Sequence, residues 1–220
     1  MDTMTIVFII WGVMLSVWIT RRFIYNREQK EALATQEDLR KKEFKAVIQN
    51  REYRENTKCY DENEFWMLID DTKKRSKGNY KNQMGLLRDK LSKFSTDELI
   101  EIDNLLIALN RKAFTWDLYA ASNIIYKDQS IDYLFLLISW IISRGEFIFN
   151  NSLVNPNIII NQDMIDMRPM TISDLISELY TIKTQKLIPE PEIPDFILIG
   201  DKWDSRELPN RYGELWQKYA

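Results

Sequence analysis

The sequence predicts an all-α protein made of a single N-terminal transmembrane helix, a charged helical stalk and a compact multi-helix domain. Three observations support this fold class. The 220 residues include only six Gly and six Pro, too few for a turn-rich β-sandwich or barrel. Apolar residues over much of the chain recur at the three- and four-residue spacing of amphipathic helices. One uncharged apolar run stands almost at the N-terminus.

Residues 1–22 are expected to form the transmembrane anchor. Residues 4–20 contain no charged side chain, and at about 1.5 Å per residue they approach the thickness of a hydrocarbon core. Arg21 and Arg22 follow directly, so the C-terminal side of the run is expected to face the cytoplasm. The sequence thus predicts a single-pass protein of the bacterial inner (cytoplasmic) membrane, with its N-terminus outside, its domain in the cytoplasm and the lipid bilayer as a partner. A buried helix of a soluble domain is the alternative.

Residues 23–58 are expected to form a charged helical stalk or linker. Together with Arg21 and Arg22 they hold 11 Lys/Arg against 7 Asp/Glu, and they contain almost no helix breakers. Glu37 and Lys41 have the i,i+4 spacing of a helical ion pair. The apolar stripe along this segment is irregular, which is typical of a solvated helix. A homodimer formed through the stalk is the alternative.

Residues 59–220 are expected to fold as a globular helical domain. Asp61-x-x-Glu64 and Ser95-x-x-Glu98 are typical of helix starts, because the first side chain of such a pattern caps the first turn. The uncharged run of ten residues over 133–142, interrupted by no breaker, indicates a buried central helix that is too short to span a membrane. Between the helices that start at those two patterns, a further helix is expected that ends near residue 93. Later helices are expected over 114–126, 131–143, 146–153 and 173–186, and an extended stretch over 189–194.

Two absences limit the chemistry that this chain can perform. It has no histidine, which excludes Ser-His-Asp catalysis, Cys-His catalysis and His-ligated zinc. Its one cysteine, Cys59, excludes an intrachain disulfide and a four-cysteine metal site. We therefore expect no cofactor and no metal. Residues 59–220 hold 19 Lys/Arg against 25 Asp/Glu, an acidic balance that argues against a nucleic-acid partner.

A block of aromatic and small residues in the middle of the chain is specific enough to suggest a family. The block consists of Phe114, Trp116-Asp117-Leu118, Tyr119 and Ala120-Ala121. It is preceded by an acidic residue close to a Phe-Trp pair and by a Ser-x-x-Glu helix start, and it is followed by a Ser/Asp turn, a helix with Trp and Gly, an Asn-Pro step and a late Trp. These are Glu62, Phe65, Trp66, Ser95, Glu98, Ser130, Asp132, Trp140, Gly145, Asn155-Pro156 and Trp203.

Over about residues 61–219 the sequence therefore resembles the bacterial domain of unknown function 4240 family. The resemblance implies a helical domain and brings no activity with it. The sequence departs from the family pattern at Ile131, where the pattern has an acidic residue, at Tyr133, where it has Gly, and at Ile138, where it has Arg.

Trp116, Asp117 and Asp132 form the polar cluster that we single out as a candidate functional or interaction site. In one interpretation Asp117 and Asp132 line a pocket between the helices expected over 114–126 and 131–143. In the other, each is a first-turn residue that stabilises its helix N-terminus, with Trp116 in the core.

Two functional hypotheses follow. The first is a membrane-anchored, cytoplasm-facing protein-binding module without catalytic activity, of the kind found in inhibitors or immunity proteins, with a protein partner of unknown identity. The alternative is a carboxylate-based enzyme or a small-ligand sensor that uses a pocket near Asp117 and Asp132. A polar pocket would favour the alternative, and an exposed aromatic or acidic surface would favour the binding module.

Overall fold

The helices of the described residues begin close to where the sequence predicts a domain. The computed structural model describes residues 53–54, 58–161, 170–191 and 196–219. The predicted anchor over 1–22, and the predicted stalk except for residues 53–54 and 58, lie outside the described residues. Among the residues that are described, no helix combines the length and the apolar character needed to cross a membrane.

The described residues are mostly helical, which confirms the all-α prediction for this part of the chain. The elements, in chain order, are β1 (Tyr53–Arg54), α2 (Glu62–Arg75), α3 (Tyr80–Leu91), α4 (Thr96–Ala113), α5 (Trp116–Tyr126), α6 (Ile131–Ser143), α7 (Glu146–Val154), the 3₁₀ helix η1 (Pro156–Asn161), α8 (Ile172–Thr184), β2 (Glu190–Pro191), α9 (Leu208–Arg211) and α10 (Gly213–Tyr219).

Capping side chains decide where the helices begin. Ser95 accepts a hydrogen bond from the backbone of Glu98, whose carboxylate accepts one from the Ser95 backbone in return, a complete capping box at the start of α4. Thr171 and Asp174 form the same arrangement at α8. At α2, Asp61 caps the backbone of Glu64. The side chains that mark these helix starts thus lie within one turn of the helices that they cap.

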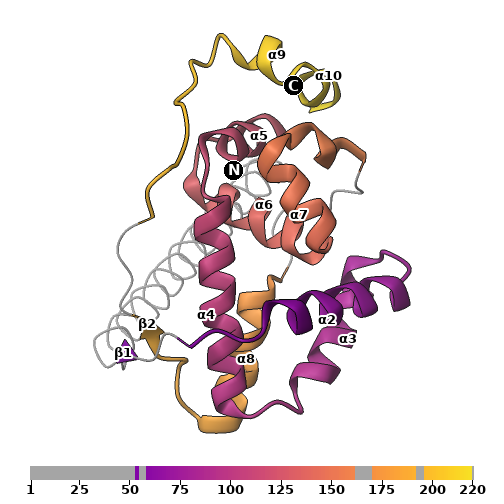
Figure 1. The fold of residues 1–220 in the computed structure, drawn as a ribbon, viewed down its shortest axis with the longest axis vertical. Coiled ribbons are helices and arrows are strands. Elements are labelled where there is room, and N and C mark those ends of the chain that lie inside the picture. Colours follow the sequence, from indigo (N-terminus) through magenta and orange to yellow (C-terminus); the bar gives the residue numbers. More distant parts are fainter. Residues whose placement is uncertain (1–52, 55–57, 162–169, 192–195, 220) are drawn as a thin grey trace, which may run out of the picture. The chain divides into compact units, whose positions relative to one another are not determined.

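Helix α6 is the centre of the hydrophobic core. Leu134, Leu137 and Ile138 are fully buried, and Trp140 is among the largest buried side chains. This confirms the prediction of a buried central helix. Helix α6 packs against α4, α5, α7 and α8. Figure 1 shows α4, α5 and α7 around α6.

The apolar faces that the sequence predicts on the other helices mostly face this core. On α4, the residues at helical spacing are all buried: Leu99, Ile102, Leu105, Leu106 and Leu109. On α8, Leu175, Ile176 and Leu179 are buried, whereas Ile182, predicted on the same face, is 59% exposed in the last turn of the helix.

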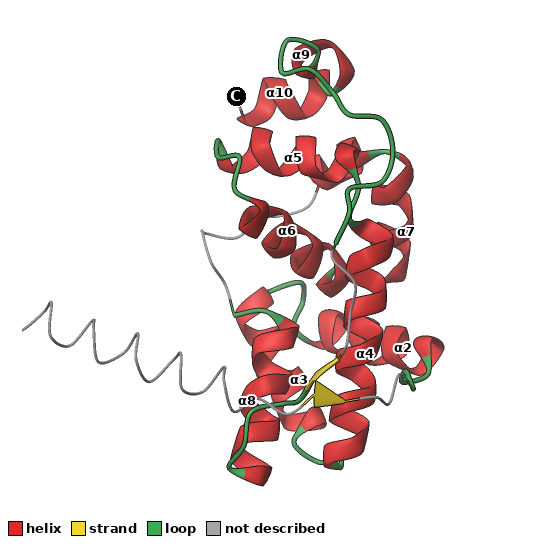
Figure 2. Ribbon diagram, turned by 90° about the vertical axis from the view of Figure 1, so that its left-hand side faces the viewer, coloured by secondary structure: helices red, strands yellow, loops and turns green. Residues whose placement is uncertain are grey.

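Several elements at the ends of the domain were not predicted. Strands β1 and β2 pair in parallel, with Tyr53 opposite Glu190 and Arg54 opposite Pro191 (Figure 2). Residues 53–54 lie within the predicted helical stalk, so the helical prediction is wrong for these two residues. The extended stretch expected over 189–194 is confirmed at residues 190–191, which form β2, and residues 192–194 lie outside the described residues. At the C-terminal end, α10 packs against α5, α9 and η1.

Candidate functional site

An open groove of about 900 Å³ lies where the N-terminal ends of α6 and α8 meet the side of α4. Its volume is within the range of small-molecule and peptide-binding sites. The lining residues come from α4, from the turn before α6, from α6 itself and from the start of α8. They are Asn110, Asp128, Ser130, Asp132, Tyr133, Phe135, Leu136, Ser139, Met170, Thr171, Ser173 and Asp174. We call this the acidic groove.

The acidic groove has negative charge and hydroxyl groups but no positive charge. Three of its lining residues are aspartates, five carry a hydroxyl group, and none is Lys or Arg. Such a surface attracts cations and groups that donate hydrogen bonds. Among the described residues, no group of three or more Cys, Asp or Glu is arranged to hold a metal ion.

Two of the three carboxylates are held in place by local hydrogen bonds. The Oδ1 atom of Asp128 accepts a bond from the Ser130 backbone at 2.7 Å. The Oδ2 atom of Asp174 accepts bonds from the backbone and the hydroxyl of Thr171, both at 2.8 Å. Asp132 is exposed in the first turn of α6, where its backbone N–H donates to the Ser130 hydroxyl at 3.3 Å. All three aspartates are exposed, and two of them are held in place by local hydrogen bonds.

The turn over 127–130, which contributes Asp128 and Ser130 to the acidic groove, follows from the way α5 ends. Lys127 adopts a left-handed conformation with φ 54°, which terminates the helix. The Tyr119 hydroxyl donates to the Gln129 carbonyl at 2.6 Å and holds the turn against α5. Ser130 then caps α6. Asp128 therefore lies on a short turn that is fixed at both ends, and Asp132 follows it in the first turn of α6.

The opposite wall is held by α3. The Tyr80 hydroxyl donates to the Met170 carbonyl at 2.7 Å, and burial raises the pKa of this hydroxyl, so it remains a donor. Arg88 on α3 forms a two-pronged ion pair with Glu178 on α8 at 2.6 and 2.7 Å. Both contacts fix the start of α8, and with it Asp174, relative to α3.

The structure does not bring together the three residues that the sequence analysis singled out. Asp132 lines the acidic groove, whereas Trp116 and Asp117 are not among its lining residues. The hypothesis of one pocket shared by Asp117 and Asp132 therefore lacks a geometric basis. The reason is that the first turn of α5 faces the C-terminal segment, while the first turn of α6 faces α8.

Asp117 instead links α5 to the C-terminal segment. Its Oδ1 atom accepts a hydrogen bond from Arg211 at 2.8 Å and another from the hydroxyl of Tyr212. Burial first, and then the hydrogen bond to Asp117, raise the pKa of Tyr212 well above its ordinary value. Thr115, rather than Asp117, caps the helix through the backbone of Leu118. Asp117 thus connects two segments of the chain that lie far apart in the sequence.

Trp116 is half-buried beneath the same C-terminal segment. Its carbonyl accepts a hydrogen bond from the indole of Trp203 at 2.8 Å, and the two rings meet edge to face at 6.1 Å. Its backbone N–H donates to the Ile199 carbonyl at 3.0 Å. These contacts assign Trp116 to packing between α5 and residues 199–203.

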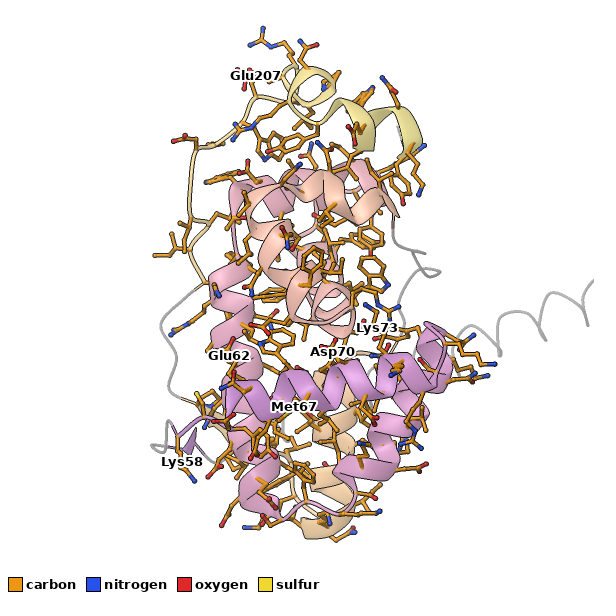
Figure 3. The ribbon with its side chains drawn as sticks, turned by 45° about the vertical axis from the view of Figure 1, so that its right-hand side comes forward. Lys58, Glu62, Met67, Asp70, Lys73 and Glu207 are labelled. Carbon is orange, nitrogen blue, oxygen red and sulfur yellow. The ribbon has the colours of Figure 1, made fainter. Side chains whose placement is uncertain are left out.

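A buried arginine that the sequence analysis did not single out joins α2, α3 and α6. The Arg144 side chain is 4% exposed and donates to the Gln83 amide oxygen at 2.6 Å and to the Gly78 carbonyl at 3.2 Å. Its guanidinium also lies over the Tyr80 ring at 5.6 Å. Lys73 on α2, labelled in Figure 3, donates to the Arg144 carbonyl at 2.5 Å, and burial lowers the pKa of this lysine. These contacts make Arg144 a structural link between helices.

Asp128 and Asp174 are the residues of the acidic groove that sequence reasoning missed. Both belong to patterns that are visible in the sequence: Asp128 precedes the Ser130 cap, and Asp174 completes the Thr171 capping box. Those patterns indicate helix starts, and nothing in them shows that the two starts lie side by side.

A family model described as a protein of unknown function (DUF4240) matches residues 60–182. The match agrees with the resemblance seen in the sequence, and it includes every residue that lines the acidic groove. Helices α9 and α10 lie beyond the matched residues. No curated protein and no solved structure matches the chain.

Proposed function

The chain belongs to the DUF4240 family, and we propose that its helical domain is a non-catalytic protein-binding module whose acidic groove receives a basic segment of a partner protein. The observation that supports this proposal most directly is the charge of the groove, which combines three aspartates with no lysine or arginine. Residues 59–220 carry a net negative charge as well, so the field of the whole domain would attract the same segment.

The energy of such binding would come from two sources. An exposed ion pair contributes only about 0.2–1 kcal/mol, so the three aspartates would act mainly on association rate and on the choice of partner. Tyr133, Phe135, Leu136 and Met170 add apolar surface to the same groove. Burying that surface would supply affinity, at about 25 cal/mol per Å² before the costs of association.

The proposal includes a tether to the inner face of the bacterial membrane through residues 1–22. The uncharged run over 4–20 and the basic pair Arg21-Arg22 support it. A module held at the membrane in this way would act on partners at that surface, as inhibitors and immunity proteins do. A dimer formed through residues 23–58 would double the number of grooves at one place.

A small-ligand sensor is the second candidate, because the volume of the groove is also that of a small-molecule site. A carboxylate-based enzyme that uses Asp117 and Asp132 together has no support in the geometry, since the two residues face different neighbours.

The binding proposal is tested by neutralising Asp132 and comparing the result with a matched control. Asp132 and Asp97 are both first-turn residues placed two positions after a serine cap, and both are exposed. Only Asp132 lines the acidic groove. The full chain and its Asp132→Asn and Asp97→Asn variants are purified in mild detergent from the native host, and the retained proteins are quantified by mass spectrometry.

We expect a retained partner with a basic segment that is recovered in several-fold lower amount with Asp132→Asn, at the wild-type amount with Asp97→Asn, and in lower amount from the wild-type chain as salt is added. Salt should release it because added ions screen contacts between exposed charges. Equal retention by the two variants, or release that does not depend on salt, would contradict the proposal.

A further inference from the structure

The turn between α2 and α3 carries a dense group of positive charges. Five of the nine residues over 73–81 are Lys or Arg, and none is Asp or Glu. We call these five residues the basic corner: Lys73, Lys74, Arg75, Lys77 and Lys81. All of them except Lys73 are exposed. Figure 3 shows α2 running from Glu62 past Lys73 into this turn.

The basic corner keeps most of its charge. Within the described part of the chain, no carboxylate forms an ion pair with Lys74, Lys77 or Lys81. Arg75 lies 3.6 Å from Asp71, which forms a closer ion pair with α3 at 2.8 Å. When the two aspartates at positions 70 and 71 are counted against the five positive residues, the net charge over 70–81 is +3.

The backbone of this turn is fixed from the side that faces the core. Lys77 and Gly78 both have positive φ, 52° and 79°, and together they reverse the chain. The Gly78 N–H donates to the Lys73 carbonyl at 3.1 Å, and the Gly78 carbonyl accepts a bond from buried Arg144 at 3.2 Å. Asn79 then caps the start of α3. The exposed charges are therefore presented from a backbone with one defined conformation.

The basic corner offers charge but little apolar surface. No large apolar side chain over 73–81 is exposed, and Tyr80, the aromatic residue of this stretch, is buried. A protein partner gains most of its affinity from buried apolar area, whereas an anionic lipid surface attracts clustered Lys and Arg through charge alone. The potential of such a surface decays within a Debye length, about 8 Å at physiological salt, so the acidic charge on more distant parts of the domain opposes this contact only weakly.

We propose that the basic corner binds the anionic headgroups of a phospholipid bilayer and orients the domain at that surface. The inference rests on the proposed tether, because residues 1–22 would keep the domain close to a bilayer. Each Lys or Arg near an anionic surface strengthens such a contact by roughly fivefold, so three lysines together contribute roughly a hundredfold. A contact of this strength is weak for a free protein and sufficient for one that is already tethered.

The test uses the full chain in lipid nanodiscs, made either of phosphatidylcholine alone or of equal parts phosphatidylcholine and phosphatidylglycerol. Lysines are modified briefly with a membrane-impermeant amine reagent and quantified by mass spectrometry. Lys183 is the internal reference, because it is exposed in the last turn of α8 and lies outside the basic corner.

We expect Lys74, Lys77 and Lys81 to react at least roughly threefold more slowly in the anionic nanodiscs, relative to Lys183. This protection should disappear at about 1 M salt, where the Debye length falls to about 3 Å.

Lys77→Gln removes one charge of the basic corner and leaves Lys74 and Lys81 as reporters. It should make their protection at least roughly twofold smaller. Lys93→Gln is the matched control, because Lys93 is also an exposed lysine just after a helix. The backbone N–H groups of Lys77 and Lys93 donate to the third preceding carbonyl at 3.1 and 3.2 Å. Lys93→Gln should leave the protection unchanged.

Equal reaction of the corner lysines in the two lipids, or equal protection in Lys77→Gln and the wild type, would overturn the proposal. Protection by added polyglutamate in phosphatidylcholine nanodiscs, with none from phosphatidylglycerol, would assign the basic corner to an acidic protein instead.

A failure of the tether is recognised separately, because the chain then does not enter nanodiscs. In that case the chain is sedimented with vesicles of the same two lipid compositions. The basic corner predicts roughly fivefold weaker binding of Lys77→Gln than of Lys93→Gln to the anionic vesicles, and equal binding of the two variants would contradict it.

Discussion

At the scale of single residues, Asp117 shows how one side chain can be structural without acting as a helix cap. Its ion pair with Arg211 joins two groups that are each 37% exposed, so solvent screening leaves it a small contribution to stability. Its hydrogen bond to Tyr212 differs in kind, because that tyrosine is only 3% exposed and its hydroxyl has little access to water. The hydrogen bond to Tyr212 therefore contributes more to stability here than the ion pair with Arg211.

We predict that Asp117→Asn lowers the free energy of unfolding by about 1 kcal/mol or less, because asparagine keeps an acceptor oxygen for Tyr212 and loses only a screened charge. Asp117→Ala should cost about 1–3 kcal/mol, since it leaves the Tyr212 hydroxyl buried and unpaired. Urea unfolding followed by circular dichroism measures both values.

Tyr212→Phe is the control for that pair. In the background of Tyr212→Phe, Asp117→Ala should lose most of its extra cost, because no hydroxyl is then left without an acceptor. An equal cost of Asp117→Ala in both backgrounds would assign the stabilisation to another contact. If Asp117→Asn instead abolished partner binding at unchanged stability, Asp117 would have a functional role.

At the scale of elements, the connection between α6 and α7 requires a glycine because of its backbone conformation. Gly145 has φ 95° and ψ 169°, a region of backbone space that is essentially restricted to glycine. A Cβ atom at this position would also lie 2.3 Å from a carboxylate oxygen of Asp70 on α2, an exposed side chain that would have to rotate away. Figure 3 labels Asp70 on α2, not far from Lys73, which contacts the neighbouring Arg144. The tight turn lets α7 begin directly after α6 and lets α2 approach it.

Gly145→Ala and Gly85→Ala should accordingly change stability in opposite directions. Alanine at position 145 is expected to cost about 1–3 kcal/mol through backbone strain, with the contact to Asp70 adding to it. Alanine at position 85, exposed within α3 and with open space around it, should stabilise the domain by about 0.5–1 kcal/mol. Thermal and urea unfolding of the two variants give the comparison.

The part of the effect that comes from the collision can be isolated by adding Asp70→Ala to Gly145→Ala. This second change should recover part of the lost stability and leave the backbone strain in place. Wild-type stability of Gly145→Ala alone would show that the turn tolerates a side chain and that this account of the turn is wrong.

At the scale of the whole molecule, the proposed function depends on which side of the membrane holds the domain. Cys59 is exposed at the start of the described domain, a short distance in sequence from the proposed anchor. We predict that a membrane-impermeant maleimide leaves Cys59 unlabelled in intact cells and labels it after lysis, because the basic flank of residues 4–20 places it inside.

Mass spectrometry of the purified chain reads the labelling directly, since the protein has no other cysteine. A cysteine introduced at Thr3 serves as the opposite marker, because it lies before the apolar run and should be labelled from outside. Labelling of Cys59 in intact cells would reverse the proposed orientation. Full release of the chain into the soluble fraction by alkaline carbonate would contradict the anchor itself.

The helices could be predicted from the sequence because the signals for them are local. Helix α6 occupies the predicted residues 131–143, and α5 begins two residues after the predicted start at 114. Ser95 and Glu98 lie three positions apart, so the hydrogen bonds of their capping box form within one turn. The burial of α6 likewise follows from its composition. Helices α9 and α10 were missed because they are only four and seven residues long, and α9 has no side-chain cap that marks its start.

What only the tertiary structure decided is which helix ends meet. The acidic groove is lined by residues from the segment over 128–139 and from the segment over 170–174. Asp117 forms its hydrogen bonds with Arg211 and Tyr212, which lie more than ninety residues later in the sequence. Hydrophobic periodicity indicates which face of a helix is buried, but it does not indicate which other helix covers that face. The sequence by itself therefore determined the helices, the buried centre and the acidic balance of the domain. The packing of those helices determined that Asp132 faces a groove while Asp117 faces the C-terminal segment, because contacts between distant segments depend on how whole apolar faces fit together.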